Sequence, residues 1–486
     1  MVIMAEILNK LYSYVSRRHF EEPGGYFEIW RIAYPLMIMS ASHLIMQFTD
    51  RFFLAMNSTE DVAAAFPAGI LYFTMFSFFM VTTNFTSALV AQFFGAKNNN
   101  ACVRAAWTGF YFAVGASIFI GYVSPQLGRF LLNHSGHAPA LITLELDYYN
   151  SMIPCGAFIC MGEPFFAFFS GRGQTKFVAV INIAACALNL ILAYMLIFGK
   201  WGAPALGIYG AGTATTLSAM FSFTCAFIGF LSVDQDVFPT RSNCKLEWVY
   251  IKKLLSFGTP AGLQVLFDVG AFTIVTFMIG YLQPAALAAT TIALTINQFS
   301  FGPLLGFTDA TSIVVGQNIG RGHKDVAEKS AYRAWRMAAA YMIFAAAVYL
   351  FLPVTLISLF SPKHGGSIID FNKVLEIGKM ILMFAAIFNF FDATKFVFMG
   401  ALRGAGDTKA VLLISAISNW GLLVSGICIL VLVFKSSIVT IWAYMTFTIL
   451  VEACIILWRF KTGKWRQIEL IKRDSGENEV KSQLEG

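Results

Sequence analysis

Twelve long apolar runs dominate this sequence of 486 residues, and each is long enough to cross a lipid bilayer as a helix. The hydrocarbon core of a bilayer is about 30 Å thick, which takes about 20 helical residues at 1.5 Å each. Several runs are longer, which indicates tilted helices or helices interrupted by proline, as at Pro154, Pro164 and Pro303. The runs lie at residues 29–55, 62–94, 101–124, 141–170, 177–198, 207–232, 249–281, 285–318, 329–359, 368–402, 409–434 and 437–459.

The composition agrees with a membrane protein built only from helices. Charged residues make up 13% of the chain and apolar residues 57%, whereas soluble domains carry about 25% charged residues. Strands of a membrane barrel would alternate in polarity over about ten residues, but segments 157–170 and 410–434 are continuously apolar. The eight cysteines are scattered through apolar runs, which excludes a disulfide-rich secreted domain. We therefore expect an all-α polytopic membrane protein.

Basic residues predict how the chain is oriented in the membrane. If the N-terminus is cytoplasmic, 26 Lys and Arg residues fall on the cytoplasmic side and 7 on the other. Cytoplasmic loops show this excess of basic residues, so we predict that both termini are cytoplasmic. The net charge of +7 reflects this topology, and we expect no nucleic-acid partner.

An internal repeat divides the chain into two halves. Residues 90–95 (VAQFFG) match residues 315–320 (VGQNIG) at a spacing of 225 residues, and residues 171–176 (GRGQTK) match residues 404–409 (GAGDTK) at a spacing of 233. Six spans per half return the chain to its starting side, so the halves share one orientation about an axis along the membrane normal. We predict two pseudo-symmetric six-helix bundles that face each other across a cleft.

These patterns predict five segments. Ile3, Ile7 and Leu11 recur every four residues, which indicates an amphipathic helix on the membrane surface at the start of the chain. The segments are an amphipathic cytoplasmic segment (1–25), an N-terminal lobe (26–233), a cytoplasmic linker (234–248), a C-terminal lobe (249–460) and a polar cytoplasmic tail (461–486).

Motifs in four of the predicted spans identify a family. They are residues 47–51 (QFTDR), residues 90–96 (VAQFFGA), Phe267-Asp268, and residues 400–408 (GALRGAGDT) with Asp392 ahead of them. In these motifs the chain resembles the multidrug and toxic compound extrusion (MATE) transporters, most closely their bacterial NorM-like branch, over about residues 26 to 460.

The resemblance implies a cation-coupled antiporter that exports amphipathic, often cationic organic compounds across the bacterial inner membrane. The expected coupling ion is H⁺ or Na⁺, with no other cofactor. The expected partners are small organic substrates and the lipid bilayer, and we expect a monomer.

Two acidic residues lie deep in the predicted spans, where an ionised side chain costs at least about 2.5–3.5 kcal/mol. Asp268 lies 15 residues after Lys253 and 13 before Tyr281, and Asp392 lies 11 residues before Arg403. Both are candidates for binding the coupling cation, including as Na⁺ ligands. NorM-like relatives usually carry Glu where this chain has Asp268. For Asp268 the structural alternative is a carboxyl group that only holds two helices together through hydrogen bonds.

Lys395 stands three residues after Asp392 and therefore shares its helix face. It departs from the family pattern, and it leaves two alternatives open. Asp392 and Lys395 form a permanently neutralised pair, or the pair is hydrated and opens, so that Lys395 competes with the coupling ion for Asp392. We favour the second alternative, because a transporter cavity is hydrated.

Three further acids are candidates for coupling or substrate binding. Asp50 matches the acid of the family in span one, but it lies close to the outer interface beside Arg51, so a solvated helix end is the alternative. Asp309 and Glu163 lie 8 or 9 residues from a cytoplasmic loop and are expected to line an inner vestibule or, alternatively, to serve packing.

The archaeal branch of the family uses an Asn and, one turn later, an Asp for a sodium site in the N-terminal half. Here Asn189 is followed at that spacing by Ala193, although Thr215 fits the pattern. The missing carboxylate favours the C-terminal lobe as the coupling lobe.

Other functions lack their residues in this sequence. No GxxxxGK[ST] phosphate loop, HExxH motif or paired-cysteine zinc spacing is present, so we do not expect an ATP-driven pump or an enzyme. The alternatives to an antiporter are a flippase for lipid-linked saccharides in the same superfamily and a membrane-embedded enzyme or receptor. The central acids and the single embedded Lys395 argue against the flippase.

Overall fold

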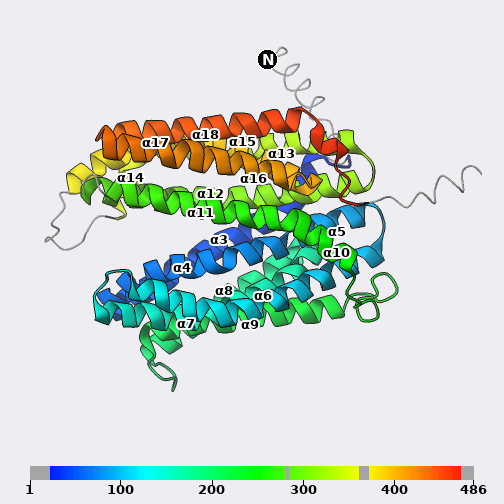
Figure 1. The fold of residues 1–486 in the computed structure, drawn as a ribbon, viewed down its shortest axis with the longest axis horizontal. Helices are drawn as coiled ribbons and strands as arrows, with labels where there is room; N and C mark the ends of the chain where they lie inside the picture. Colours follow the sequence, from blue (N-terminus) through cyan, green and yellow to red (C-terminus); the bar gives the residue numbers. More distant parts are fainter. Residues whose placement is uncertain (1–21, 281–283, 361–370, 472–486) are drawn as a thin grey trace, which may run out of the picture.

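The structure is a computed structural model that describes residues 22–280, 284–360 and 371–471. Long helices lie nearly parallel to one another and form the whole body of the molecule (Figure 1). The predicted surface helix at residues 1–20 and the end of the polar tail lie outside the described residues.

The N-terminal lobe contains seven helices that make six membrane spans. Its second span is broken at Phe85 into two helices, α4 and α5. The helices are α3 (Tyr26–Asn57), α4 (Thr59–Asn84), α5 (Thr86–Gly95), α6 (Asn99–Asn133), α7 (Pro139–Gly171), α8 (Thr175–Phe198) and α9 (Gly207–Leu231).

The C-terminal lobe has the same number of spans, and two of them contain π-helical turns. The elements are α10 (Trp248–Lys253), η1 (Leu254–Gly258), α11 (Thr259–Gly280), α12 (Pro284–Gly320), α13 (Lys324–Phe351), α14 (Pro353–Ser358), α15 (Phe371–Ala405), α16 (Thr408–Ala416), η2 (Ile417–Val424), α17 (Ser425–Cys428), η3 (Ile429–Val433), α18 (Ile438–Lys461) and η4 (Lys464–Gln467).

The predicted twelve spans are confirmed. Eleven of them are long and apolar enough, within the described residues, to cross a membrane by length and composition. The twelfth, α12, carries polar residues such as Asn297, Gln298 and Asp309, and it packs along α15 and α3. The chain is therefore a multi-pass membrane protein. The expected proline interruptions are absent from the described helices, because α7 continues through Pro154 and Pro164 and α12 through Pro303.

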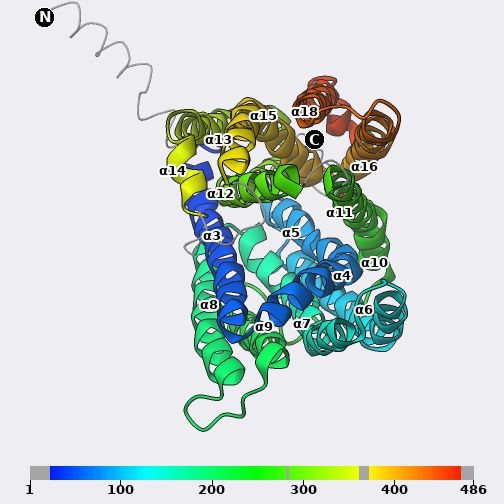
Figure 2. The ribbon, with the colours of Figure 1, turned by 90° about the vertical axis from the view of Figure 1, so that its left-hand side faces the viewer.

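The two lobes meet along four helices. Viewed along the helices, α4 and α6 to α9 lie on one side and α13 to α18 on the other, with α3, α5, α11 and α12 between them (Figure 2). A shared hydrophobic cluster joins the lobes, in which Ile29, Ile32 and Leu36 of α3 pack with Leu304 and Phe307 of α12. Helix α4 contacts α11 on the other side of the interface.

Candidate functional site

Asp268 lies in α11 within a chain of polar side chains in the C-terminal lobe. Its carboxylate accepts a hydrogen bond from Asn419 Nδ2 at 2.7 Å and another from Gln264 Nε2 at 3.2 Å. Gln264 in turn accepts a hydrogen bond from Arg403 Nη2 at 2.8 Å. The carboxylate is half-buried and each of its oxygens already has a side-chain donor.

The structure corrects the predicted partner of Lys395. Lys395 Nζ forms its ion pair with Glu452 Oε2 of α18 at 2.6 Å, and Ser415 donates to the other oxygen of Glu452 at 3.0 Å. Glu452 is 2% exposed and Lys395 is 9% exposed, so the pair is buried. Asp392 lies one turn before Lys395 and is also buried, and both Asp392 and Asp268 interact electrostatically with the ammonium group. The long lysine side chain extends away from its own helix toward α18.

Glu452 is the functional candidate that the sequence reasoning missed. It is a single carboxylate in the apolar run 437–459, so the argument that singled out Asp268 and Asp392 would have found it as well. Together these residues place three carboxylates around one buried ammonium group.

Asp309 and Glu163 belong to the boundary between the lobes. Asp309 lines a pocket there with Asn84, Ser312, Gly400 and Arg403, which come from both lobes. Asn84 Nδ2 donates to Glu163 Oε2 at 2.9 Å, and Asp309 interacts electrostatically with Glu163. The structure therefore brings this predicted pair together, and Arg403 links them to Gln264 and so to the Asp268 cluster.

Asp50 lies in a separate cluster of the N-terminal lobe. It is 9% exposed and lies beside Thr215 of α9, to which Asn189 of α8 donates a hydrogen bond at 3.2 Å. The alternative of a solvated helix end is therefore wrong, because α8 and α9 cover this part of α3. The Oδ1 atoms of Asp50 and Asn189 are buried and accept no hydrogen bond from any residue that the structure describes. The adjacent Ala193 is fully buried.

The two clusters differ in how well they fit an added cation. Sodium binds oxygen ligands, and Asp50 and Asn189 offer two buried oxygens without donors, so the N-terminal cluster fits an added cation. In the C-terminal cluster both oxygens of Asp268 accept hydrogen bonds and Lys395 already supplies a positive charge.

A family model gives the chain its identity. The model, described as MatE, matches residues 35–195 and 260–430, which is more than half of the chain. The chain belongs to the MatE family. The two matched parts begin 225 residues apart, which is the spacing of the internal repeat, and one lies in each lobe.

Curated relatives and solved structures agree with membership of the MatE family. A probable multidrug resistance protein NorM of Bradyrhizobium diazoefficiens is 29% identical over 403 residues, which is 81% of this chain and 84% of the relative. A probable multidrug resistance protein NorM of Thermotoga maritima is 23% identical over 453 residues, or 92% of this chain and 94% of the relative.

A solved structure described as the outward-facing conformation of a multidrug resistance MATE family transporter superposes with a TM-score of 0.83. Its sequence is 17% identical to this chain, and the superposition covers 92% of this chain and 98% of the solved one. At this identity the likeness establishes the fold of this MatE protein.

Proposed function

We propose that this MatE protein is a cation-coupled antiporter that exports amphipathic, often cationic organic compounds by alternating access. The observation that carries the proposal is the set of carboxylates that lie at and beside the boundary between the two lobes. Asp309 lines the pocket between the lobes, and the Asp268 cluster connects to it through Gln264 and Arg403. The names of the NorM relatives support export of drugs as the substrate class. We propose the bacterial inner membrane as the location, with a monomeric chain and both termini in the cytoplasm.

The charge arrangement supports coupling by competition. A cationic substrate and a coupling cation are both attracted to carboxylates, so binding of one weakens binding of the other. Antiport requires in addition that each ligand binds the two facings of the lobes with different affinity, because equal affinity shifts no equilibrium. Asp268, Asp392 and Asp309 are the proposed coupling acids of the C-terminal half, with Glu163 at the boundary.

We propose different roles for the two lobes. In the C-terminal lobe the ammonium group of Lys395 is a fixed positive charge near Asp268 and Asp392. The negative charge of these two carboxylates is therefore balanced partly by Lys395 and partly by an added H⁺ or Na⁺. In the N-terminal lobe the donor-free oxygens of Asp50 and Asn189 support binding of an added cation. The sequence favoured the C-terminal lobe for coupling and kept Asp50 as a candidate, and the geometry supports including Asp50.

Export from a pump-deficient bacterial host tests the proposal. We expect the wild-type chain to lower accumulation of cationic dyes and Asp268→Asn to abolish this effect at equal membrane abundance. Asp147→Asn is the matched control, because Asp147 is an exposed residue of α7. Inverted vesicles with separate ΔpH and ΔpNa then identify the coupling ion. Dye accumulation unchanged by the wild-type chain would contradict the proposal and favour the flippase alternative.

A further inference from the structure

The four segments that carry the internal repeat meet at one place between the lobes. Gln92 at the end of α5 donates through Nε2 to the carbonyl oxygen of Gly404 in α15 at 2.8 Å. Gln317, its repeat counterpart at the end of α12, donates through Nε2 to the carbonyl oxygen of Gly171 at the end of α7, also at 2.8 Å. Each glutamine therefore reaches from its own lobe to the other lobe, and the two contacts are related by the repeat.

The backbones of α5 and α12 touch at the same place. A Cβ atom on Gly95 would lie 2.1 Å from the carbonyl oxygen of Gln317, and a Cβ atom on Gly320 would lie 2.0 Å from that of Gln92. No other residue type fits either position without separating the helices. Both glutamines are buried, with Gln92 1% and Gln317 3% exposed. We call Gln92, Gly95, Gln317 and Gly320 the glutamine lock.

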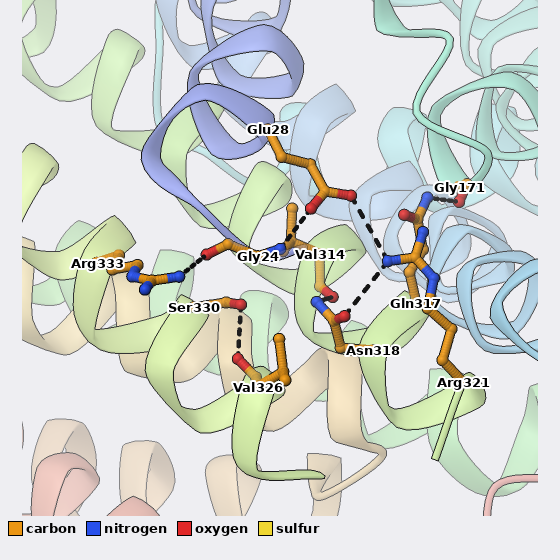
Figure 3. A network of polar contacts seen from close by, with 10 residues as sticks. All are labelled: Gly24, Glu28, Gly171, Val314, Gln317, Asn318, Arg321, Val326, Ser330 and Arg333. Atoms are coloured by element: carbon orange, nitrogen blue, oxygen red, sulfur yellow. Dashed lines mark hydrogen bonds and ion pairs between the residues drawn. The ribbon is translucent and has the colours of Figure 1, made fainter. Parts of the chain in front are cut away.

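A charged rim lies beside the glutamine lock on the predicted cytoplasmic side (Figure 3). Glu28 of α3 accepts a hydrogen bond from the backbone of Gly24 and lies 3.7 Å from Arg321, which follows α12. Arg333 of α13 donates to the carbonyl oxygen of Gly24 at 3.0 Å. The start of the N-terminal lobe is thus attached to the C-terminal lobe at the same end of the molecule as Gln317.

Toward their opposite ends, the interface helices α3 and α11 carry exposed aromatic side chains. Phe48 and Phe52 in α3 and Phe272 and Phe277 in α11 are each more than half exposed. Among the described residues, the buried side-chain hydrogen bonds between the lobes are the two glutamine contacts and one from Thr82 in α4 to the carbonyl oxygen of Gly258 in η1 at 3.4 Å.

We propose that Gln92 and Gln317 are gating residues, which hold the cytoplasmic ends of the lobes together and must release before the transporter can open to the cytoplasm. That the two lobes separate during a transport cycle rests on the proposed function. The hydrogen bonds that hold the lobes together in this structure do not depend on it. Hydrogen bonds within one lobe survive a rigid-body movement of the lobes, but these two bonds cannot. Two neutral hydrogen bonds bias a conformational equilibrium on the order of 5- to 150-fold. That is enough to favour the closed state and weak enough to be overcome by a bound ligand.

A reversible cross-link tests whether the contact opens. A Cβ atom on Gly316 would lie 3.1 Å from Cβ of Ala91, which is close to the 3.5–4.5 Å that a disulfide requires. We expect Ala91→Cys with Gly316→Cys to lose efflux in vesicles on oxidation and to regain it on reduction. Each variant with only one of the two added cysteines serves as a control and should be insensitive to oxidation. Wild-type efflux by the fully cross-linked protein would overturn the proposal.

A second measurement does not depend on transport. Spin labels at Asn98 and His323, which stand on the two lobes beside the glutamine lock, report the separation of the cytoplasmic ends in detergent. We expect Gln92→Leu with Gln317→Leu to increase the open population about 5- to 150-fold relative to the closed one, and each single variant to have an intermediate effect. An unchanged distance distribution in the double variant would refute the glutamine lock. An increase without any dye transport would leave the lock intact and contradict only the proposed function.

Discussion

The buried pair of Lys395 and Glu452 makes a sharp prediction about stability. Breaking a buried ion pair by removing one partner costs about 3–5 kcal/mol, because the other charge is left without compensation. The two single variants are not equivalent here. Lys395→Met leaves Glu452, Asp392 and Asp268 around a site without its ammonium group, whereas Glu452→Gln leaves Lys395 near two remaining carboxylates.

We therefore expect Lys395→Met to cost about 5 kcal/mol and Glu452→Gln about 3 kcal/mol or less. The double variant Lys395→Met with Glu452→Gln removes both charges and keeps a side chain that Ser415 can contact, so it should be more stable than Lys395→Met alone. The double variant is more stable than Lys395→Met only if the coupling energy in this double-mutant cycle exceeds the cost of Glu452→Gln. We therefore expect a coupling energy of about 3 kcal/mol or more, at the upper end of the values for residues in direct contact.

Thermal unfolding of the purified variants in one detergent, followed by tryptophan fluorescence, gives the order of stability. We expect the wild type to be the most stable and Lys395→Met the least stable, with the double variant and Glu452→Gln between them. Additive effects of the two substitutions, or a Lys395→Met variant as stable as the wild type, would show that the ion pair is open or absent in the protein.

Three other predictions concern different parts of the molecule. Ser135 and His323 are both exposed in loops. A cysteine at position 135 should react with a membrane-impermeant reagent from outside, and a cysteine at position 323 only after permeabilisation. The reverse pattern would overturn the predicted orientation. Gly320→Ala should destabilise the protein by about 1–3 kcal/mol because its Cβ meets backbone, whereas Gly115→Ala on α6 meets no atom within 4 Å and should have no such cost in the same melting assay. Asp50→Asn should remove Na⁺- or H⁺-stimulated efflux without lowering abundance, and wild-type ion dependence in that variant would exclude Asp50 from coupling.

The spans and lobes could be predicted because they follow from local properties of the sequence. Long apolar runs fix the helices, and the repeat spacing fixes the two halves, so both are confirmed by the structure and by the two-part family match. The depths of Asp268 and Asp392 follow from counting residues along a helix. The domain boundaries at residues 233–234 and 460–461 stay predictions.

Contacts between distant helices could not be predicted in the same way. Helix periodicity gave Lys395 its neighbour Asp392 on the same face, but the direction of a long side chain depends on what the next helix offers, which is Glu452 57 residues later. The burial of Asp50 likewise depends on α8 and α9, which cover the end of α3. The matching glutamine motifs were visible in the sequence, but their role required knowing that residues 92 and 404 meet.

The distribution of charge supports a division between rigid lobes and a separable boundary. The buried ion pair Lys395–Glu452 lies within one lobe, and so does the pair in which Arg459 contacts Asp407 at 2.8 Å. Opening such pairs would leave buried charges at a cost of several kcal/mol, so they are suited to contacts that persist through a cycle. Across the boundary the buried hydrogen bonds between described residues are neutral, with Gln92, Gln317 and Thr82 donating to backbone carbonyl oxygens. Water can replace each of them at a net cost of about 0.5–1.5 kcal/mol. Two ion pairs among the described residues join the start of the chain to the C-terminal lobe, Glu28 with Arg321 and Glu22 with Arg333. Both are partly exposed, and exposed pairs contribute only about 0–1 kcal/mol. A boundary built from such contacts can open and close repeatedly while each lobe keeps its own charged core intact.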